Sequence, residues 1–174
     1  MTIDSLHEYV GEYRIQLQKG VIQRAYKGLM EYILGLRTDL QGRYPGYFVS
    51  GSIYYGYMDM TYFSFFPQSL KERGLKAGVV FLHEAFRFEA WLFGYNKQVQ
   101  SRYWKYFKDS GWNKYRLVPT LKGQDSILEY ILVDDPDFSD LDRLTKQVEA
   151  GMLRFIQDVE SFLTAHPMPA IPKT

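Results

Sequence analysis

Two acidic residues and one arginine could form a metal or anion site if the chain folds as its pattern predicts. Asp59 interrupts an apolar, strand-like run from Ile53 to Phe66, and a charge in such a strand must be solvated, paired or functional. Alternation places Arg87, Glu89 and Trp91 together on one face of another strand. If the two faces coincide, Asp59 and Glu89 could hold Mg²⁺ or Mn²⁺, because these cations prefer carboxylate oxygens.

Such a metal site would suit phosphodiester hydrolysis, since a bound cation polarises the phosphate. The expected order of a helix, three strands and a helix also resembles the core of restriction-endonuclease-like nucleases. Those nucleases carry lysine two residues after the acid, whereas Glu89 is followed by Ala90 and Trp91, so Lys97 would have to substitute. We favour the simpler interpretation, in which Asp59 or Glu89 pairs with Arg87 and no metal is bound.

The same strands also predict a ligand pocket. Tyr55 and Tyr57 would share a face with Asp59, and aromatic residues make up 17% of the chain, enough to line a stacking surface. We expect Tyr55, Tyr57, Arg87 and Trp91 to bind an anionic or planar group. This interpretation makes the protein a binding or interaction module for an unknown small molecule or protein, without a cofactor, rather than an enzyme.

A basic segment offers a third type of site, a metal-independent surface for nucleic acid. Residues 97–122 carry seven lysines and arginines against one aspartate, whereas residues 123–166 carry three against ten acidic residues. A tryptophan among lysines could stack a base while the amines bind phosphates. We favour the alternative that the two segments pair within the chain. The candidate face lies on the helix predicted for residues 96–108 and comprises Lys97, Trp104, Lys105 and Lys108.

The spacing of apolar residues predicts the elements that position these candidates. Two amphipathic helices, the first capped by Asp4 or Ser5, are expected before Tyr44. Between residues 47 and 93 the period changes to two and predicts an antiparallel meander of three to four strands. Residues 126–133 are expected to form a brief helix. The fold class is therefore α+β, with a single antiparallel sheet covered by N-terminal and C-terminal helices.

A last helix of about 25 residues is expected to begin after a cap at Ser139. Its apolar residues recur at nearly 3.5-residue spacing, which favours a core position but could also join two copies in a homodimer. We expect one domain over residues 1–166 and a disordered tail over residues 167–174. The residues of the seam are Leu141, Leu144, Val148, Met152, Phe155, Val159 and Phe162.

Composition narrows the cellular setting. The net charge of +1 gives no global attraction to nucleic acid or membrane, and the chain contains no cysteine for disulfides, thiol catalysis or thiolate metal sites. No targeting segment and no run of about 20 apolar residues is present, so we expect a cytoplasmic protein that is not embedded in a membrane.

Five stretches of the chain are distinctive as sequence, namely YFVSGSIYYGYMDMTYFSF, RFEAWLFGYNKQVQ, WNKY, KGQDSI and DLDRLTKQVEAGMLRFIQDVESFL. In these stretches the chain resembles a bacterial family known as a domain of unknown function. The resemblance runs from about Leu6 to Leu163 and implies a stand-alone bacterial protein of this length, with no catalytic residue to transfer.

Overall fold

The computed structural model describes residues 3–168. The chain divides into two compact units, residues 1–38 and residues 39–174, and the division falls within the second helix. Of the tail expected over residues 167–174, positions 169–174 lie outside the described residues.

The first unit contains α1 (Ile3–Gln18) and most of α2 (Val21–Arg43). The helix α1 begins at Ile3, before the cap expected at Asp4 or Ser5, and it ends at Gln18, two residues before Gly20, whose positive φ of 69° suits the turn after a helix. Its apolar face follows the expected spacing but is not buried. Four side chains of this face are more than half exposed, namely Leu6, Tyr9, Val10 and Tyr13.

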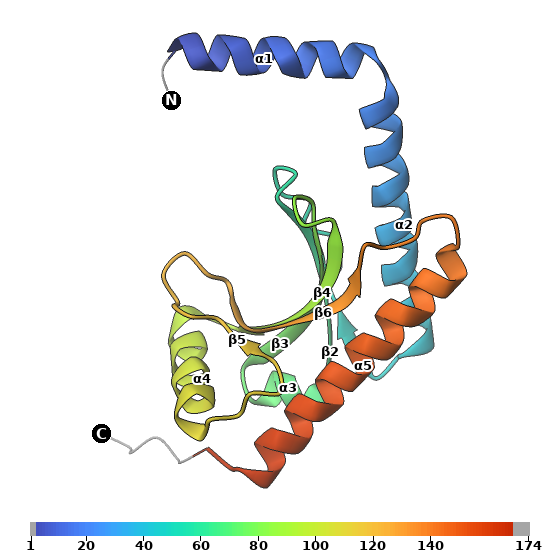
Figure 1. Ribbon diagram of the computed structural model, residues 1–174. Coiled ribbons are helices and arrows are strands. Elements are labelled where there is room, and N and C mark those ends of the chain that lie inside the picture. The colour runs from blue at the N-terminus through green and yellow to red at the C-terminus, as the bar shows by residue number, and fades with distance from the viewer. Residues whose placement is uncertain (1–2, 169–174) are drawn as a thin grey trace. The chain divides into compact units, whose positions relative to one another are not determined.

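The second unit is built on one antiparallel sheet with strand order β1-β2-β3-β4-β6-β5 (Figure 1). The fold class is therefore α+β as expected, but the sheet has six strands rather than three to four. Its strands are β1 (Tyr47–Val49), β2 (Met60–Pro67), β3 (Leu75–Leu82), β4 (Arg87–Gly94), β5 (Arg116–Leu117) and β6 (Ser126–Asp134).

The strand β6 was expected to be a brief helix, and that prediction is wrong. Its residues 126–129 are buried in succession, so both faces of the strand are covered at this point and its sequence lacks the alternation that identifies a strand. The two shortest strands, β1 and β5, have three and two residues, too few for a period to be visible.

The helices of this unit are α3 (Gln68–Glu72), α4 (Lys97–Ser110) and α5 (Leu141–Ala165). In Figure 1, α5 runs along one face of the sheet, and α4 lies near β5. The cap of α5 is Asp140, which accepts a hydrogen bond from Arg143 N at 3.0 Å, one residue after the expected Ser139. Buried residues of α5 include five of the expected seam, so the seam is part of the protein's own core: Leu144, Val148, Met152, Phe155 and Val159.

The two faces of the sheet differ in chemistry. The core face carries Phe63, Phe81 and Phe88, all fully buried, and Tyr130 of β6 stacks there on Phe155 of α5 at 6.4 Å. The opposite side is called the polar face below. It is defined on β4 by Arg87, Glu89, Trp91 and Phe93, and on β2 by Tyr62 and Ser64.

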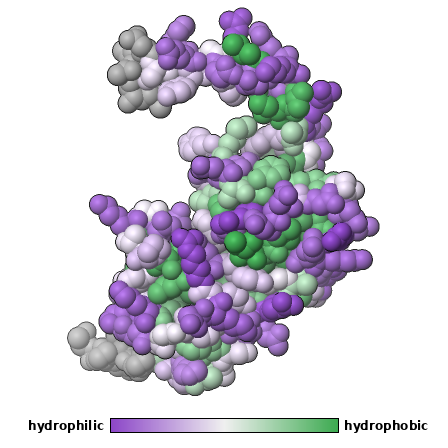
Figure 2. Space-filling model, in the orientation of Figure 1, coloured by the Kyte–Doolittle hydropathy of each residue, from purple (hydrophilic) through white to green (hydrophobic). Residues whose placement is uncertain are grey.

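Among residues 3–168, no helix combines the length and apolarity needed to cross a membrane. Hydrophobic surface nevertheless appears among hydrophilic groups around the sheet, as the green areas of Figure 2 show. Ile131 of β6, for example, is 42% exposed in the structure.

Candidate functional site

Asp59 and Glu89, the candidate metal pair, do not share a face of the sheet. Asp59 lies in the loop before β2, because the strand begins at Met60 rather than Ile53, and the preceding Gly56 and Met58 have positive φ angles that break the expected alternation. Hydrogen bonds from the backbone N–H groups of Met60 and Tyr57 lower the pKa of the exposed Asp59 carboxyl. In the sheet, Glu89 of β4 lies opposite Val80 of β3, and Val80 lies opposite Tyr62 of β2. Glu89 is therefore two strands away from β2, and its row of the sheet meets β2 three residues after Asp59.

Tyr55 and Tyr57 belong to the same loop and not to the sheet face that carries Arg87 and Trp91. Tyr57 is 95% exposed, and Tyr55 uses its carbonyl to accept a hydrogen bond from Thr61 Oγ1 at 3.1 Å. Thr61 Oγ1 also lies 2.9 Å from His83 Nε2, and burial lowers the pKa of His83. The loop therefore adds no ring to the expected pocket.

Arg87, Glu89 and Trp91 do come together on β4, as the two-residue period predicts. Glu89 is 2% exposed, and its Oε1 accepts a hydrogen bond from Arg87 Nε at 2.7 Å. The same oxygen forms an ion pair with Arg87 Nη2 at 2.6 Å. Its Oε2 accepts from Trp91 Nε1 at 2.6 Å. Both carboxylate oxygens thus accept from donors of the same strand.

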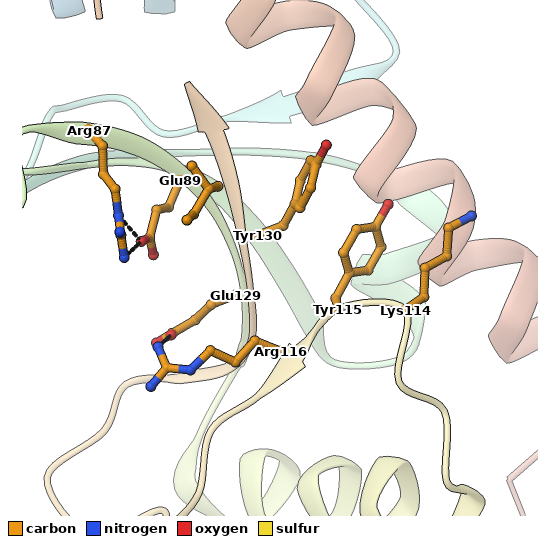
Figure 3. Close-up of a pocket in the computed structure, with 8 residues that line it drawn as sticks. Arg87, Glu89, Lys114, Tyr115, Arg116, Glu129 and Tyr130 are labelled. Carbon is orange, nitrogen blue, oxygen red and sulfur yellow. Dashed lines mark hydrogen bonds and ion pairs between the residues drawn. The ribbon is translucent and has the colours of Figure 1, made fainter. Parts of the chain in front are cut away.

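A second buried carboxylate with the same arrangement lies on the neighbouring strand. Glu129 of β6 pairs in register with Trp91 and is 8% exposed. Its Oε2 accepts from Arg116 at 2.6 Å, and its Oε1 accepts from Ser126 Oγ at 2.7 Å. Figure 3 shows Arg87 with Glu89 and Arg116 with Glu129 on the same side of β6.

These two pairs border a cavity of about 300 Å³, called the arginine cavity here. The lining residues are Arg87, Glu89, Lys114, Tyr115, Arg116, Glu129, Tyr130 and Ile131 (Figure 3).

Lys114 and Tyr115 are fixed to α5 by one carboxylate. Asp158 accepts from Tyr115 Oη at 2.5 Å and pairs with Lys114 at 2.8 Å. Burial and this bond to Asp158 raise the pKa of Tyr115 well above its ordinary value. Burial acts to raise the pKa of Asp158, but the hydrogen bonds from Lys114 and Tyr115 outweigh it and lower that pKa. This wall of the cavity is therefore tied to the core.

A second cavity of about 370 Å³, called the aromatic cavity, lies further along β4 on the polar face. The ring of Tyr62 stacks with that of Phe93, with 5.7 Å between the ring centroids, and its centroid lies 5.1 Å from that of Tyr54. The ring centroids of Phe93 and Trp91 are 5.9 Å apart. The cavity is lined by Tyr54, Met60, Tyr62, Ser64, Lys76, Phe93, Gly94, Tyr95, Asn96, Lys97, Gln100 and Asp125.

The basic face of α4 has local partners. Trp104 is half-buried, with its Nε1 donating to the Val118 carbonyl at 2.7 Å and Lys108 lying over its ring at 4.7 Å. Lys105 pairs with Asp109 at 2.6 Å, and Lys97 with Asp125 at 3.6 Å. Three ion pairs join the basic segment, residues 97–122, to the acidic segment, residues 123–166, as expected if the two segments pair within the chain. They are Lys97 with Asp125, Lys114 with Asp158, and Arg116 with Glu129.

Local sequence patterns did not indicate the residues that complete both cavities. Glu129 was hidden because β6 was predicted to be a helix, so Arg116 was counted among the basic residues without this partner. Tyr62 was placed on the other face because the β2 alternation was counted from Ile53. In the described part of the chain, no cluster of three histidine, aspartate or glutamate side chains could hold a metal ion.

The fold and these cavities define an α+β protein with one hollow beside β6 and a second hollow on the polar face of its antiparallel sheet. Residues 6–163 match the family described as Domain of unknown function (DUF7000), and the chain belongs to this family. No curated protein and no solved structure matches the chain.

Proposed function

We propose that this protein binds a small ligand bearing a phosphate or carboxylate group in the arginine cavity. Arg87 and Arg116 would contact the oxyanion, because guanidinium groups bind such anions in two-point geometry. Glu89 and Glu129 would act as positioning residues behind them. Trp91 would hold Glu89 in place through its indole N–H.

The observation that supports this proposal is the burial of both glutamates. Removing a carboxylate from water costs several kcal/mol, and an apolar pair of similar volume is often as stable. Glu89 and Glu129 are nevertheless at least nine-tenths buried, each behind an arginine that remains partly accessible. The arrangement fixes two guanidinium groups at the border of one cavity, as an anion site requires.

The volume also suits a small ligand, since about 300 Å³ lies at the lower end of small-molecule pockets. We propose that this binding takes place in the bacterial cytoplasm. The absence of cysteine supports this proposal, because a protein without disulfides does not depend on an oxidising compartment. We do not propose the nuclease alternative, because Glu89 has both oxygens occupied and Asp59 lies in a separate loop.

The test compares thermal unfolding in phosphate, malonate and chloride at matched ionic strength and pH. A ligand bound only to the folded state raises the midpoint, by roughly 2–4 °C for each kcal/mol of binding in a chain of this size. The double variant Arg116→Gln/Glu129→Gln removes one guanidinium without leaving a buried charge. We expect it to unfold near the wild-type midpoint in chloride and to lose its response to phosphate or malonate.

The matched control is Lys122→Gln, which removes one exposed positive charge outside the cavity. It should keep the full response. If neither anion stabilises the wild type, or if the double variant responds as the wild type does, the two pairs are structural salt bridges and the proposal fails.

A further inference from the structure

The aromatic cavity has walls that suit a flat ligand. Tyr54, Tyr62 and Phe93 come from three separate segments and form a row of rings across the polar face. Gly78 of β3 makes the row continuous, because a Cβ at this position would lie 3.2 Å from the Phe93 ring and 2.9 Å from the Phe63 carbonyl. A side chain here would therefore separate Phe93 from Tyr62.

Two tyrosine rings at the rim of this cavity are exposed to solvent. Tyr54 is 44% exposed and Tyr95 is 70% exposed, and both line the cavity. An aromatic ring with an open face is a platform for stacking, and each base stacked on such a ring typically gains about 1–3 kcal/mol. The cavity therefore favours a ligand with a planar ring.

The same cavity carries one net positive charge, from Lys76 and Lys97 against Asp125. The Lys76 ammonium lies over the Tyr95 ring at 4.7 Å, and among the described residues it has no carboxylate within ion-pair distance. The pair between Lys97 and Asp125 is long, at 3.6 Å, and both side chains are largely exposed. Lys97 also donates to the Gln124 carbonyl at 3.0 Å, so an anion entering between the two lysines would compete with one neutral hydrogen bond and one long ion pair.

The backbone brings the second lysine to the rings. Gly94 ends β4, and a Cβ there would lie 2.4 Å from Gln100 N, so only glycine lets the first turn of α4 come this close to the strand. Asn96 caps this turn by accepting from Val99 N at 2.9 Å, and Lys97 follows directly. The strand end and the helix start thus hold Phe93 and Lys97 on the same cavity.

We infer that the aromatic cavity binds a nucleotide, with the base stacked on the exposed Tyr54 ring and the phosphate between Lys76 and Lys97. The volume of about 370 Å³ lies within the range of small-molecule pockets. The site shares no lining residue with the arginine cavity, so it stands independently of the function proposed there.

The experiment titrates the full chain with adenosine 5′-monophosphate, adenosine and ribose 5-phosphate by calorimetry at low salt. We expect the nucleotide to bind at least about tenfold more tightly than either fragment, because each fragment keeps only one of the two contacts. The variants Tyr54→Leu and Lys76→Met should each weaken nucleotide binding about fivefold or more. Both change side chains that are not buried, so the fold should persist.

Tyr57→Leu is the matched control, since it removes an exposed ring outside the cavity. It should bind the nucleotide as the wild type does, and so should the variant Arg116→Gln/Glu129→Gln. If the Arg116 variant loses the nucleotide while Tyr54→Leu retains it, the phosphate sits in the arginine cavity and this inference is wrong. Absence of binding at millimolar nucleotide, or equal affinity for adenosine, also overturns it.

A nucleotide could be free or part of a strand, and a second titration separates the two sources. A ten-residue single strand of deoxythymidylate is compared with thymidine 5′-monophosphate at 50 and 200 mM salt. A free nucleotide as the ligand predicts similar affinity for both. A nucleic acid predicts at least tenfold tighter binding of the strand and a steep loss with salt. Either result supports the site if Tyr54→Leu weakens it.

Discussion

A buried carboxylate on a half-exposed sheet face is stable only while its oxygens keep their donors. The Glu89 carboxylate accepts its side-chain hydrogen bonds from Arg87 and Trp91. We therefore expect Arg87→Ala to destabilise the protein by about 3 kcal/mol, since it leaves a charge without its partner. The loss would be measured by urea unfolding at neutral pH.

The double variant Arg87→Met/Glu89→Gln is the comparison. It removes both charges together and keeps an amide oxygen that can accept from Trp91 Nε1. It should unfold within about 1 kcal/mol of the wild type, because a buried ion pair contributes little over a neutral pair. If Arg87→Ala alone is neutral, Glu89 is not held as the hydrogen bonds indicate.

Asp158 gives the protein a specific sensitivity to acid. Its folded pKa is lowered by Lys114 and Tyr115, so the ionised form stabilises the fold above the ordinary pKa of 3.8. That contribution is lost as the pH falls through the lowered, folded-state value. We expect Asp158→Asn to be less stable than the wild type at pH 6 and to lose less of its stability between pH 4 and pH 2. Parallel urea midpoints for both proteins would contradict this.

How well the sequence predicted single residues depended on the regularity of the backbone. Arg87, Glu89 and Trp91 meet because β4 keeps its period of two from residue 87 to residue 91. Tyr55, Tyr57 and Asp59 do not join them, because no alternation survives two positive φ angles in four residues. The positive φ at Met58 could not be predicted from the sequence, because methionine rarely adopts this conformation.

At the scale of elements, one glycine sets the distance between α5 and β6. A Cβ on Gly151 would lie 2.8 Å from Leu132 Cδ2, so the helix could not stay where it is without displacing that leucine. Gly-to-Ala changes within helices usually stabilise by about 0.5–1 kcal/mol. We expect Gly151→Ala to give no gain, and Gly151→Leu to cost about 1–3 kcal/mol as overpacking does.

The control for this prediction is Gly42→Ala in α2, where a Cβ meets nothing within 4 Å. It should be neutral or slightly stabilising in the same urea assay. Equal gains at both glycines would mean that α5 does not pack on Leu132 as described.

Helices were predictable where burial is one-sided. The helices α4 and α5 follow their patterns, because each has one covered and one exposed side. The strands β3 and β4 were predicted although most of their residues are buried, because valine and aromatic residues favour strands and a turn separates the two runs. The strand β6 was not predicted, since its first four residues are all buried and its apolar run fits a short helix equally well. Pairing with β4 makes this segment a strand rather than a helix, and such pairing depends on residues far apart in the sequence, which no local pattern contains.

At the scale of the whole molecule, the two units should differ in local stability. The helix α1 has no buried residue among those whose side chains are described, and a single helix of 16 residues is only marginally stable in water. The strand β3, by contrast, has six buried residues of eight and two paired neighbours. Amide protection follows such differences, because sparsely packed segments open without global unfolding. We expect the amides of α1 to exchange at least roughly a hundredfold faster than those of β3 in native-state hydrogen exchange of the full chain. Equal protection would mean that the apolar face of α1 is covered in solution.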